Sequence, residues 1–168
     1  MNRVVAYVGV GANLGQPAAQ VAHAIDALRG LPDSELAACS SLYASAPIDA
    51  PGPEYVNAVV ALRTALDAPV LLQALHGIEA RFGRERSGHN APRTLDLDLL
   101  LYGDLCSDEP SLRVPHPRLH QRAFVLRPLL EIAPQLEVPG LGPLAPWLAR
   151  VREQRIRRLD EPAQGPTP

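Results

Sequence analysis

Two aspartates, Asp96 and Asp98, lie two residues apart within residues 92–102, a segment that is otherwise typical of an apolar strand. Because side chains alternate along a strand, both carboxylates would lie on one face of the sheet, about 7 Å apart. Two bare carboxylates at that distance repel each other, and a shared divalent cation removes the repulsion. Oxygen ligands favour Mg²⁺, which keeps part of its water shell and recruits substrate phosphates. A solvated strand face is the alternative, but such a face usually mixes several polar residue types. The pattern therefore predicts a metal site.

All 16 basic residues of the chain are arginine. Without a lysine, the phosphate-binding lysines of P-loop proteins and protein kinases and a Schiff-base lysine are all excluded. Any phosphate chemistry must therefore use arginine, backbone amides and metal ions. Guanidinium groups bind phosphates through paired hydrogen bonds and stay charged. A solvated basic loop is the alternative for the arginines that precede the aspartates, but the nearby carboxylates favour a polyphosphate site, with Arg93 as its leading candidate. These arginines are Arg81, Arg84, Arg86 and Arg93.

Two further groups have the chemistry to contact a ligand. His116 lies between two prolines that restrict the backbone, so the sequence indicates a positioned side chain that could donate to a phosphate. An inert loop histidine is the alternative. Tyr55 and Asn57 share one face of a predicted strand, where a ring and a carboxamide could stack on and hydrogen-bond a heterocycle. An ordinary strand with a buried tyrosine is the alternative there.

The elements that must position these groups follow from hydrophobic spacing and from breaks at glycine and proline. Asp67 is expected to cap a helix that Gly83 ends, and Pro128 to interrupt or delay a later one. The order β-α-β-β-α-β predicts a ferredoxin-like α+β sandwich with a mainly antiparallel sheet and helices on both faces. Strands are expected at residues 3–11, 36–46, 55–66, 94–102 and 105–106, and helices at 17–31, 70–82, 121–132 and 143–150.

Residues 9–15 place three glycines between the first strand and the first helix, close to the dinucleotide-binding fingerprint. Three residues rather than two separate the second and third glycines, and no acidic residue ends a second strand at the expected distance. An NAD(P)-binding oxidoreductase is therefore an alternative that needs a parallel sheet. We interpret the loop instead as a close backbone approach to a ligand or as a packing turn.

The length of 168 residues suffices for one domain, expected at residues 1–160, with a disordered tail at 161–168. The net charge of −2 provides no global field that attracts nucleic acid or an anionic membrane. The five arginines of residues 150–158 are accordingly expected to form a solvated terminal element. No apolar run approaches the roughly 18–20 residues that span a bilayer. Cys39 and Cys106 form neither a disulfide framework nor a zinc motif, so we expect a reduced, cytoplasmic protein.

Six motifs follow one another in a fixed order, at residues 7–15, 55–58, 83–84, 92–98, 114–117 and 124–134. Between about residues 6 and 147 the chain resembles the 6-hydroxymethyl-7,8-dihydropterin pyrophosphokinase family. The resemblance implies transfer of the β,γ-pyrophosphoryl group of ATP to the hydroxymethyl oxygen of the pterin, with release of AMP, in folate biosynthesis. It also implies a monomer that binds ATP and the pterin but neither nucleic acid nor membranes. A non-catalytic nucleotide-binding protein is the remaining alternative, which the loss of the aspartates or of Arg93 would favour.

The resemblance also assigns roles to single residues. Asp96 and Asp98 would hold two Mg²⁺ ions on the triphosphate, and Asp98 is the nearest candidate for accepting the hydroxymethyl proton. Tyr55 and Phe124 would enclose the pterin ring, while Asn57 would hydrogen-bond its polar edge. The pterin pocket would also be lined by Gly11, Ser45, Ala46 and Ile48. The residues expected to contact ATP are the two catalytic arginines Arg84 and Arg93, together with Glu79, His116 and Arg122.

Overall fold

The computed structural model describes residues 2–46, 52–84 and 95–159, and for Gly83 and Arg84 it describes the backbone. Six strands form the main sheet: β1 (Val4–Ala12), β2 (Ser34–Cys39), β3 (Tyr43–Ser45), β4 (Tyr55–Thr64), β5 (Asp96–Tyr102) and β10 (Ile156–Arg158). Their order in space is β10-β3-β4-β1-β5, and β2 also pairs with β4. Every pair within this sheet is antiparallel. The pairing excludes the parallel sheet that the NAD(P)-binding alternative requires.

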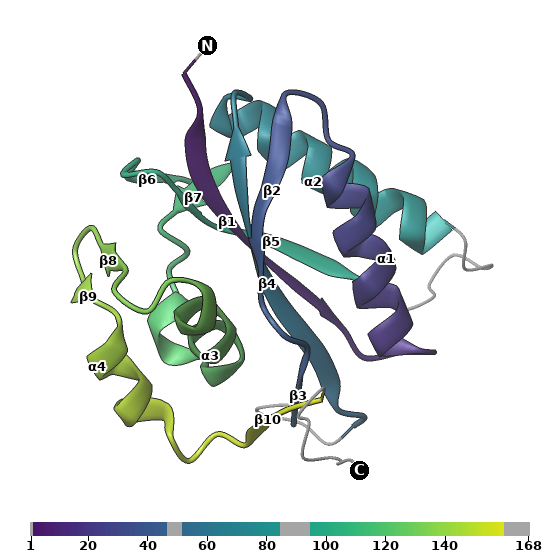
Figure 1. The fold of residues 1–168 in the computed structure, drawn as a ribbon, viewed down its shortest axis with the longest axis vertical. Coiled ribbons are helices and arrows are strands. Elements are labelled where there is room, and N and C mark those ends of the chain that lie inside the picture. The colour runs from purple at the N-terminus through teal and green to yellow at the C-terminus, as the bar shows by residue number, and fades with distance from the viewer. Residues whose placement is uncertain (1, 47–51, 85–94, 160–168) are drawn as a thin grey trace.

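Helices cover both faces of the sheet, as predicted (Figure 1). On one face, α1 (Pro17–Arg29) and α2 (Ala68–Arg84) pack over a buried cluster that includes Leu75. On the other face, α3 (Ala123–Ile132) packs over a second buried cluster that includes Leu126. Two helices on one face of an antiparallel sheet with this strand order define the ferredoxin-like arrangement, so the predicted fold class is confirmed.

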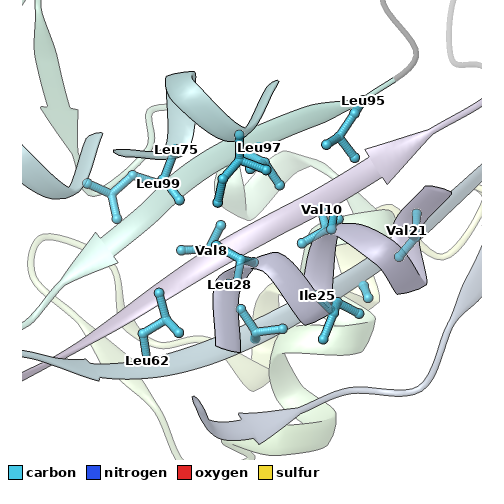
Figure 2. Packing of buried hydrophobic residues seen from close by; sticks show 14 of the residues in the cluster. Val8, Val10, Val21, Ile25, Leu28, Leu62, Leu75, Leu95, Leu97 and Leu99 are labelled. Carbon is cyan, nitrogen blue, oxygen red and sulfur yellow. The ribbon is translucent and has the colours of Figure 1, made fainter. Parts of the chain in front are cut away.

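Side-chain alternation along β5 decides which residues face each helix layer. Leu97 and Leu99 point into the cluster beneath α1 and α2, together with valines of β1 (Figure 2). Asp96 and Asp98 alternate with these leucines and are exposed on the opposite side. The prediction that the two carboxylates share one face is confirmed. The same alternation turns the glycines of β1 toward that side of the sheet.

The strand predicted at residues 36–46 is two strands, because the chain is irregular at residues 40–42. Cys39 lies opposite Val60 and Tyr43 lies opposite Asn57, so three residues of one chain segment face two of β4. The Ser40 hydroxyl accepts a hydrogen bond from the Val59 amide at 2.9 Å and donates to the Ser41 carbonyl at 2.8 Å. A serine side chain that competes for backbone groups in this way replaces part of the regular ladder.

Three helices also differ from the prediction. α2 begins directly after Asp67, but it continues through Gly83 to Arg84, so Gly83 does not end it. α3 begins at Ala123 and continues through Pro128, which removes one backbone donor from the helix without breaking it. The helix predicted at 143–150 is shorter, with α4 (Ala145–Leu148) followed by a 3₁₀ turn, η2 (Ala149–Val151).

Short elements in the C-terminal part were not predicted where they occur. The strand expected at 105–106 is part of a turn instead, since the Leu105 amide donates to the Tyr102 carbonyl at 3.0 Å. β10 has no counterpart in the prediction, and the expected tail at 161–168 lies outside the described residues. No helix within the described ranges is long and apolar enough to cross a membrane. The remaining elements are β6 (Ser107–Glu109), β7 (Leu112–Val114), η1 (Leu119–Gln121), β8 (Glu137–Val138) and β9 (Gly142–Pro143).

Candidate active site

A cavity of about 360 Å³ lies between the sheet and the start of α3. It brings together groups from β1, β4, β5 and α3, which are distant in sequence. Eight of the predicted site residues line it: Gly11, Ala46, Tyr55, Asn57, Asp96, Asp98, Arg122 and Phe124. The cavity therefore joins the predicted metal-binding pair to the predicted ring-binding residues in one space.

The two carboxylates lie on the edge strand β5, opposite two glycines of β1. Asp96 is paired in register with Gly11 and Asp98 with Gly9, so no side chain of β1 stands beside them. Glu79 of α2 accepts a hydrogen bond from the Leu97 amide at 2.6 Å, between the two aspartates. The structure thus places Glu79 on the backbone that carries the carboxylate pair, and it does not line the cavity. As an edge strand, β5 has no neighbouring strand on the side away from β1. The hydrogen bond from the Leu97 amide to Glu79 therefore holds the backbone between the two aspartates in place.

The donor set fits a magnesium ion that is shared with a phosphate ligand. Within the described residues, no three His, Cys, Asp or Glu side chains gather into a group that could hold a metal. Mg²⁺ in phosphate-transfer sites is usually bound through one or two carboxylates, while waters and substrate phosphates complete its coordination. Asp96 and Asp98 supply those two carboxylates at the wall of the cavity.

The other end of the cavity presents an amide whose orientation is fixed. Asn57 is 5% exposed, and its Nδ2 donates to the Ser45 hydroxyl at 2.8 Å. Its Oδ1 lies so close to Gly11 that a Cβ built at that position would be 3.0 Å away. Ser45 is buried behind Asn57 and does not line the main cavity. The structure therefore places Ser45 as a partner of the amide rather than as a wall of the pocket.

Two arginines and an aromatic ring stand at the α3 side of the cavity. The Arg122 guanidinium lies 5.4 Å from the centre of the Phe124 ring, a distance typical of a cation–π contact. Arg118 also lines the cavity. Both guanidinium groups are permanently charged, so they can neutralise phosphate oxygens bound in the same cavity as the aspartates.

His116 is half-buried close to Asp98, Arg118 and Arg122, although it is not itself among the residues that line the cavity. Its amide donates to the Leu100 carbonyl of β5 at 2.9 Å, and its Nδ1 accepts from the Arg118 amide at 3.1 Å. Burial lowers the pKa of His116 below its ordinary 6.5; Asp98 opposes this change, and Arg122 and Arg118 add to it. The imidazole is therefore neutral at pH 7, and with Nδ1 accepting, Nε2 carries the proton.

Four predicted residues are not placed by side chain. Ile48, Arg86 and Arg93 lie outside the described residues, and Arg84 is seen as the last backbone position of α2. In the other direction, sequence reasoning missed Arg118 and Gly9, which line the cavity. Alternation from Gly11 would have indicated Gly9. Arg118 follows the Pro-His-Pro motif directly, but nothing in the sequence distinguishes it from a solvated loop arginine.

Residues 7–134 match the family described as 7,8-dihydro-6-hydroxymethylpterin-pyrophosphokinase (HPPK). A Pseudomonas aeruginosa protein named 2-amino-4-hydroxy-6-hydroxymethyldihydropteridine pyrophosphokinase is 46% identical over 154 residues, covering 91% of this chain and 95% of that protein. A Haemophilus influenzae protein of the same name is 41% identical over 158 residues, covering 94% of this chain and 99% of that one. The chain belongs to the HPPK family.

Solved structures agree with this assignment at the level of the fold. The Plasmodium falciparum HPPK-DHPS chain, solved with pterin and p-hydroxybenzoate, superposes with a TM-score of 0.70 at 12% identity. The superposition covers 94% of this chain and 45% of that chain. This chain therefore spans about half the length of the fusion protein, and it shares the fold of one part of it.

Proposed function

We propose that this protein transfers the pyrophosphoryl group of ATP to the hydroxymethyl oxygen of 6-hydroxymethyl-7,8-dihydropterin, a step in the synthesis of folate. In this reaction the hydroxymethyl oxygen forms a bond to the β-phosphorus of ATP. The bond from that phosphorus to the oxygen bridging the α-phosphorus breaks, and AMP leaves. The observation that carries the proposal is that Asp96 and Asp98 line the same cavity as Tyr55, Asn57 and Phe124.

The pterin would bind at the end of the cavity formed by β4 and α3. Tyr55 comes from β4 and Phe124 from α3, so the two rings approach the cavity from different elements and suit a flat heterocycle. The Asn57 amide would read the polar edge of the ring, because Ser45 holds its Nδ2 and directs its Oδ1 toward Gly11. Ala46 and Ile48 would also line the pterin pocket.

The triphosphate would bind at the β5 end. Asp96 and Asp98 would hold two Mg²⁺ ions, which when bound neutralise phosphate charge and orient the triphosphate for in-line attack. Arg122 and Arg118 line the same cavity from the α3 side and would contact the triphosphate across it, and Arg84 and Arg93 belong to the proposal through the family motif. His116 is neutral and carries its proton on Nε2, so it can donate a hydrogen bond to a phosphate oxygen.

The attacking hydroxyl must lose its proton, and Asp98 is the acceptor that we propose. Asp98 lines the same cavity as the ring-binding residues Tyr55 and Phe124. An Asp98→Asn enzyme would keep the size of the side chain but could not take up the proton. If that variant retained both metal affinity and the wild-type rate, this role would be excluded.

The test of the proposed function is AMP release from ATP, measured with the pterin and Mg²⁺. We expect AMP only when the pterin is present. Asp96→Asn should reduce the rate by about a hundredfold or more, since removal of one group that stabilises transition-state charge has effects of this size. Asp108→Asn is the matched control, because Asp108 is an exposed aspartate of β6 outside the cavity. Release of ADP in place of AMP would contradict the proposal.

Two further parts of the proposal rest on analogy with the family. We expect a monomer of 18.1 kDa acting in the cytoplasm. Light scattering on the purified protein tests the first part, and a mass of twice this value would contradict it.

A further inference from the structure

The C-terminal segment of residues 154–158 contacts both β3 and the start of α3. β10 pairs with β3, which places Ile156 opposite Ser45, the partner of the Asn57 amide. Two residues earlier, the side chain of Gln154 is bound to the backbone at the start of α3. Figure 1 shows β10 beside β3, with the chain arriving there from α4. One short segment therefore joins β3, which pairs with β4, to the start of α3.

Gln154 makes two hydrogen bonds to backbone that is more than thirty residues away in sequence. Its Oε1 accepts from the Ala123 amide at 2.8 Å, and its Nε2 donates to the Gln121 carbonyl at 3.0 Å. The first amides of a helix have no partner within the helix, and Arg122, the N-cap residue of α3, makes no capping bond with its side chain. Gln154 thus supplies the cap that the local sequence does not.

The capped backbone carries two residues of the cavity wall. Arg122 and Phe124 flank Ala123 on either side, and both line the main cavity. Gln154 itself lines a second cavity of about 370 Å³, which shares Ala46 and Phe124 with the first. Gln154 therefore stands one layer behind the surface that the ring would contact, where it can fix position without touching the ligand.

We propose that Gln154 is a positioning residue that holds the Phe124 wall at its distance from the Asn57 wall and so determines pterin affinity. The inference rests on the proposed function for the identity of the ligand. It follows from the two hydrogen bonds to residues 121–123 and from the strand pairing that begins two residues later. The same two bonds also flank Arg122, which the proposed function assigns to the triphosphate, so the loss of Gln154 should weaken pterin binding more than ATP binding.

The experiment compares Gln154→Leu with the wild-type enzyme. Leucine removes both hydrogen bonds and keeps most of the side-chain volume. We expect the KM for the pterin to rise about tenfold, as the loss of two hydrogen bonds to a helix start predicts, with a smaller rise in the KM for ATP and kcat within twofold of wild type. Gln154→Glu keeps the acceptor for the Ala123 amide and loses the donor to Gln121. Its KM for the pterin should therefore lie between those of the wild-type enzyme and Gln154→Leu. Arg152→Ala is the control, because Arg152 is exposed, lies two residues before Gln154 and does not line the main cavity.

Two further measurements separate positioning from general stability. Hydrogen exchange should show lost protection at the Ala123 amide in Gln154→Leu, with amides of β1 unchanged. Direct binding of the pterin, followed by its own fluorescence, should weaken to the same extent as KM. An unchanged pterin KM, or an equal rise of the pterin and ATP KM values with a lowered melting temperature, would overturn the proposal. If the wild-type protein binds the pterin without releasing AMP, the proposed function fails, and the binding comparison still decides the role of Gln154.

Discussion

Gly11 and Asn57 lie opposite each other across β1 and β4, and the pocket depends on the space between them. A Cβ at Gly11 would stand 3.0 Å from Asn57 Oδ1, which is tighter than an ordinary contact. We expect Gly11→Ala to displace the Asn57 amide from its present position. The KM for the pterin should then rise about tenfold, because the buried amide no longer has the orientation in which it would hydrogen-bond the ring.

The neighbouring glycine provides the comparison for that variant. A Cβ at Gly9 would meet the Leu100 side chain at 3.6 Å, an ordinary contact distance. Gly9→Ala should therefore raise the pterin KM much less than Gly11→Ala does. Steady-state kinetics with the pterin as the varied substrate checks the pair, and equal effects of the two substitutions would contradict this account of Gly11.

The relative placement of two site residues could be predicted when both lie on the same strand. Alternation alone placed Asp96 and Asp98 on one face, and the structure confirms that placement. Contacts such as Glu79 with the Leu97 amide, or Gln154 with the Ala123 amide, join residues on separate elements. Local patterns do not contain that information, because such contacts depend on how the elements pack.

At the scale of elements, Glu131 ties the end of α3 to β3 and the segment before it. Its carboxylate accepts hydrogen bonds from the Tyr43 hydroxyl at 2.7 Å and from the Ser41 amide and hydroxyl at 3.0 and 2.9 Å. Burial alone would raise the pKa of Glu131, but these hydrogen bonds and the charge of Arg158 hold it below its ordinary 4.5. Burial and the bond to Glu131 raise the pKa of Tyr43 to about 12.

The lowered pKa makes a pH-dependent prediction. A carboxyl group whose pKa is lower in the folded state stabilises the fold above about pH 4.5, and this contribution is lost as the pH falls through the folded pKa. Glu131→Gln should therefore lower the free energy of unfolding at pH 7, and the difference from wild type should shrink below pH 4.5. Urea unfolding at several pH values measures this, and a difference that stays constant with pH would contradict it.

The strand break at residues 40–42 and the added strand β10 mark where element prediction failed. The hydrophobic pattern predicted one strand over residues 36–46. In the structure the Ser40 hydroxyl accepts the hydrogen bond of the Val59 amide, which interrupts the backbone pairing with β4. β10 is a three-residue edge strand, too short for alternation to reveal, and its arginines suggested a solvated terminal element instead. Four of the five arginines of residues 150–158 are exposed, as expected, whereas Arg158 is half-buried and donates to the Ser41 hydroxyl at 2.9 Å.

At the scale of the whole molecule, one sheet separates two buried clusters. The order of strands and helices was enough to predict this arrangement, since each element had a clear hydrophobic period. The small hairpins and the course of the C-terminal part were not predictable, because short segments are held by contacts with the rest of the fold rather than by their own pattern.

The two clusters should unfold together, because the sheet is common to both. Leu28 of α1 is fully buried in the first cluster, and Leu28→Ala should lower the free energy of unfolding by about 2–5 kcal/mol. Trp147, the single tryptophan, packs against the second cluster on the other side of the sheet. Its fluorescence should report the same shifted midpoint as circular dichroism. An unshifted fluorescence midpoint would mean that the two layers unfold independently.

The central claim is that one cavity joins a ring-binding end to a metal–triphosphate end and transfers two phosphates together. Phosphorus-31 NMR of a reaction containing the protein, ATP, Mg²⁺ and 6-hydroxymethyl-7,8-dihydropterin tests this most directly. The account predicts AMP and, in equal amount, a pterin diphosphate with two mutually coupled phosphorus signals. ADP accompanied by a single phosphomonoester signal would contradict it.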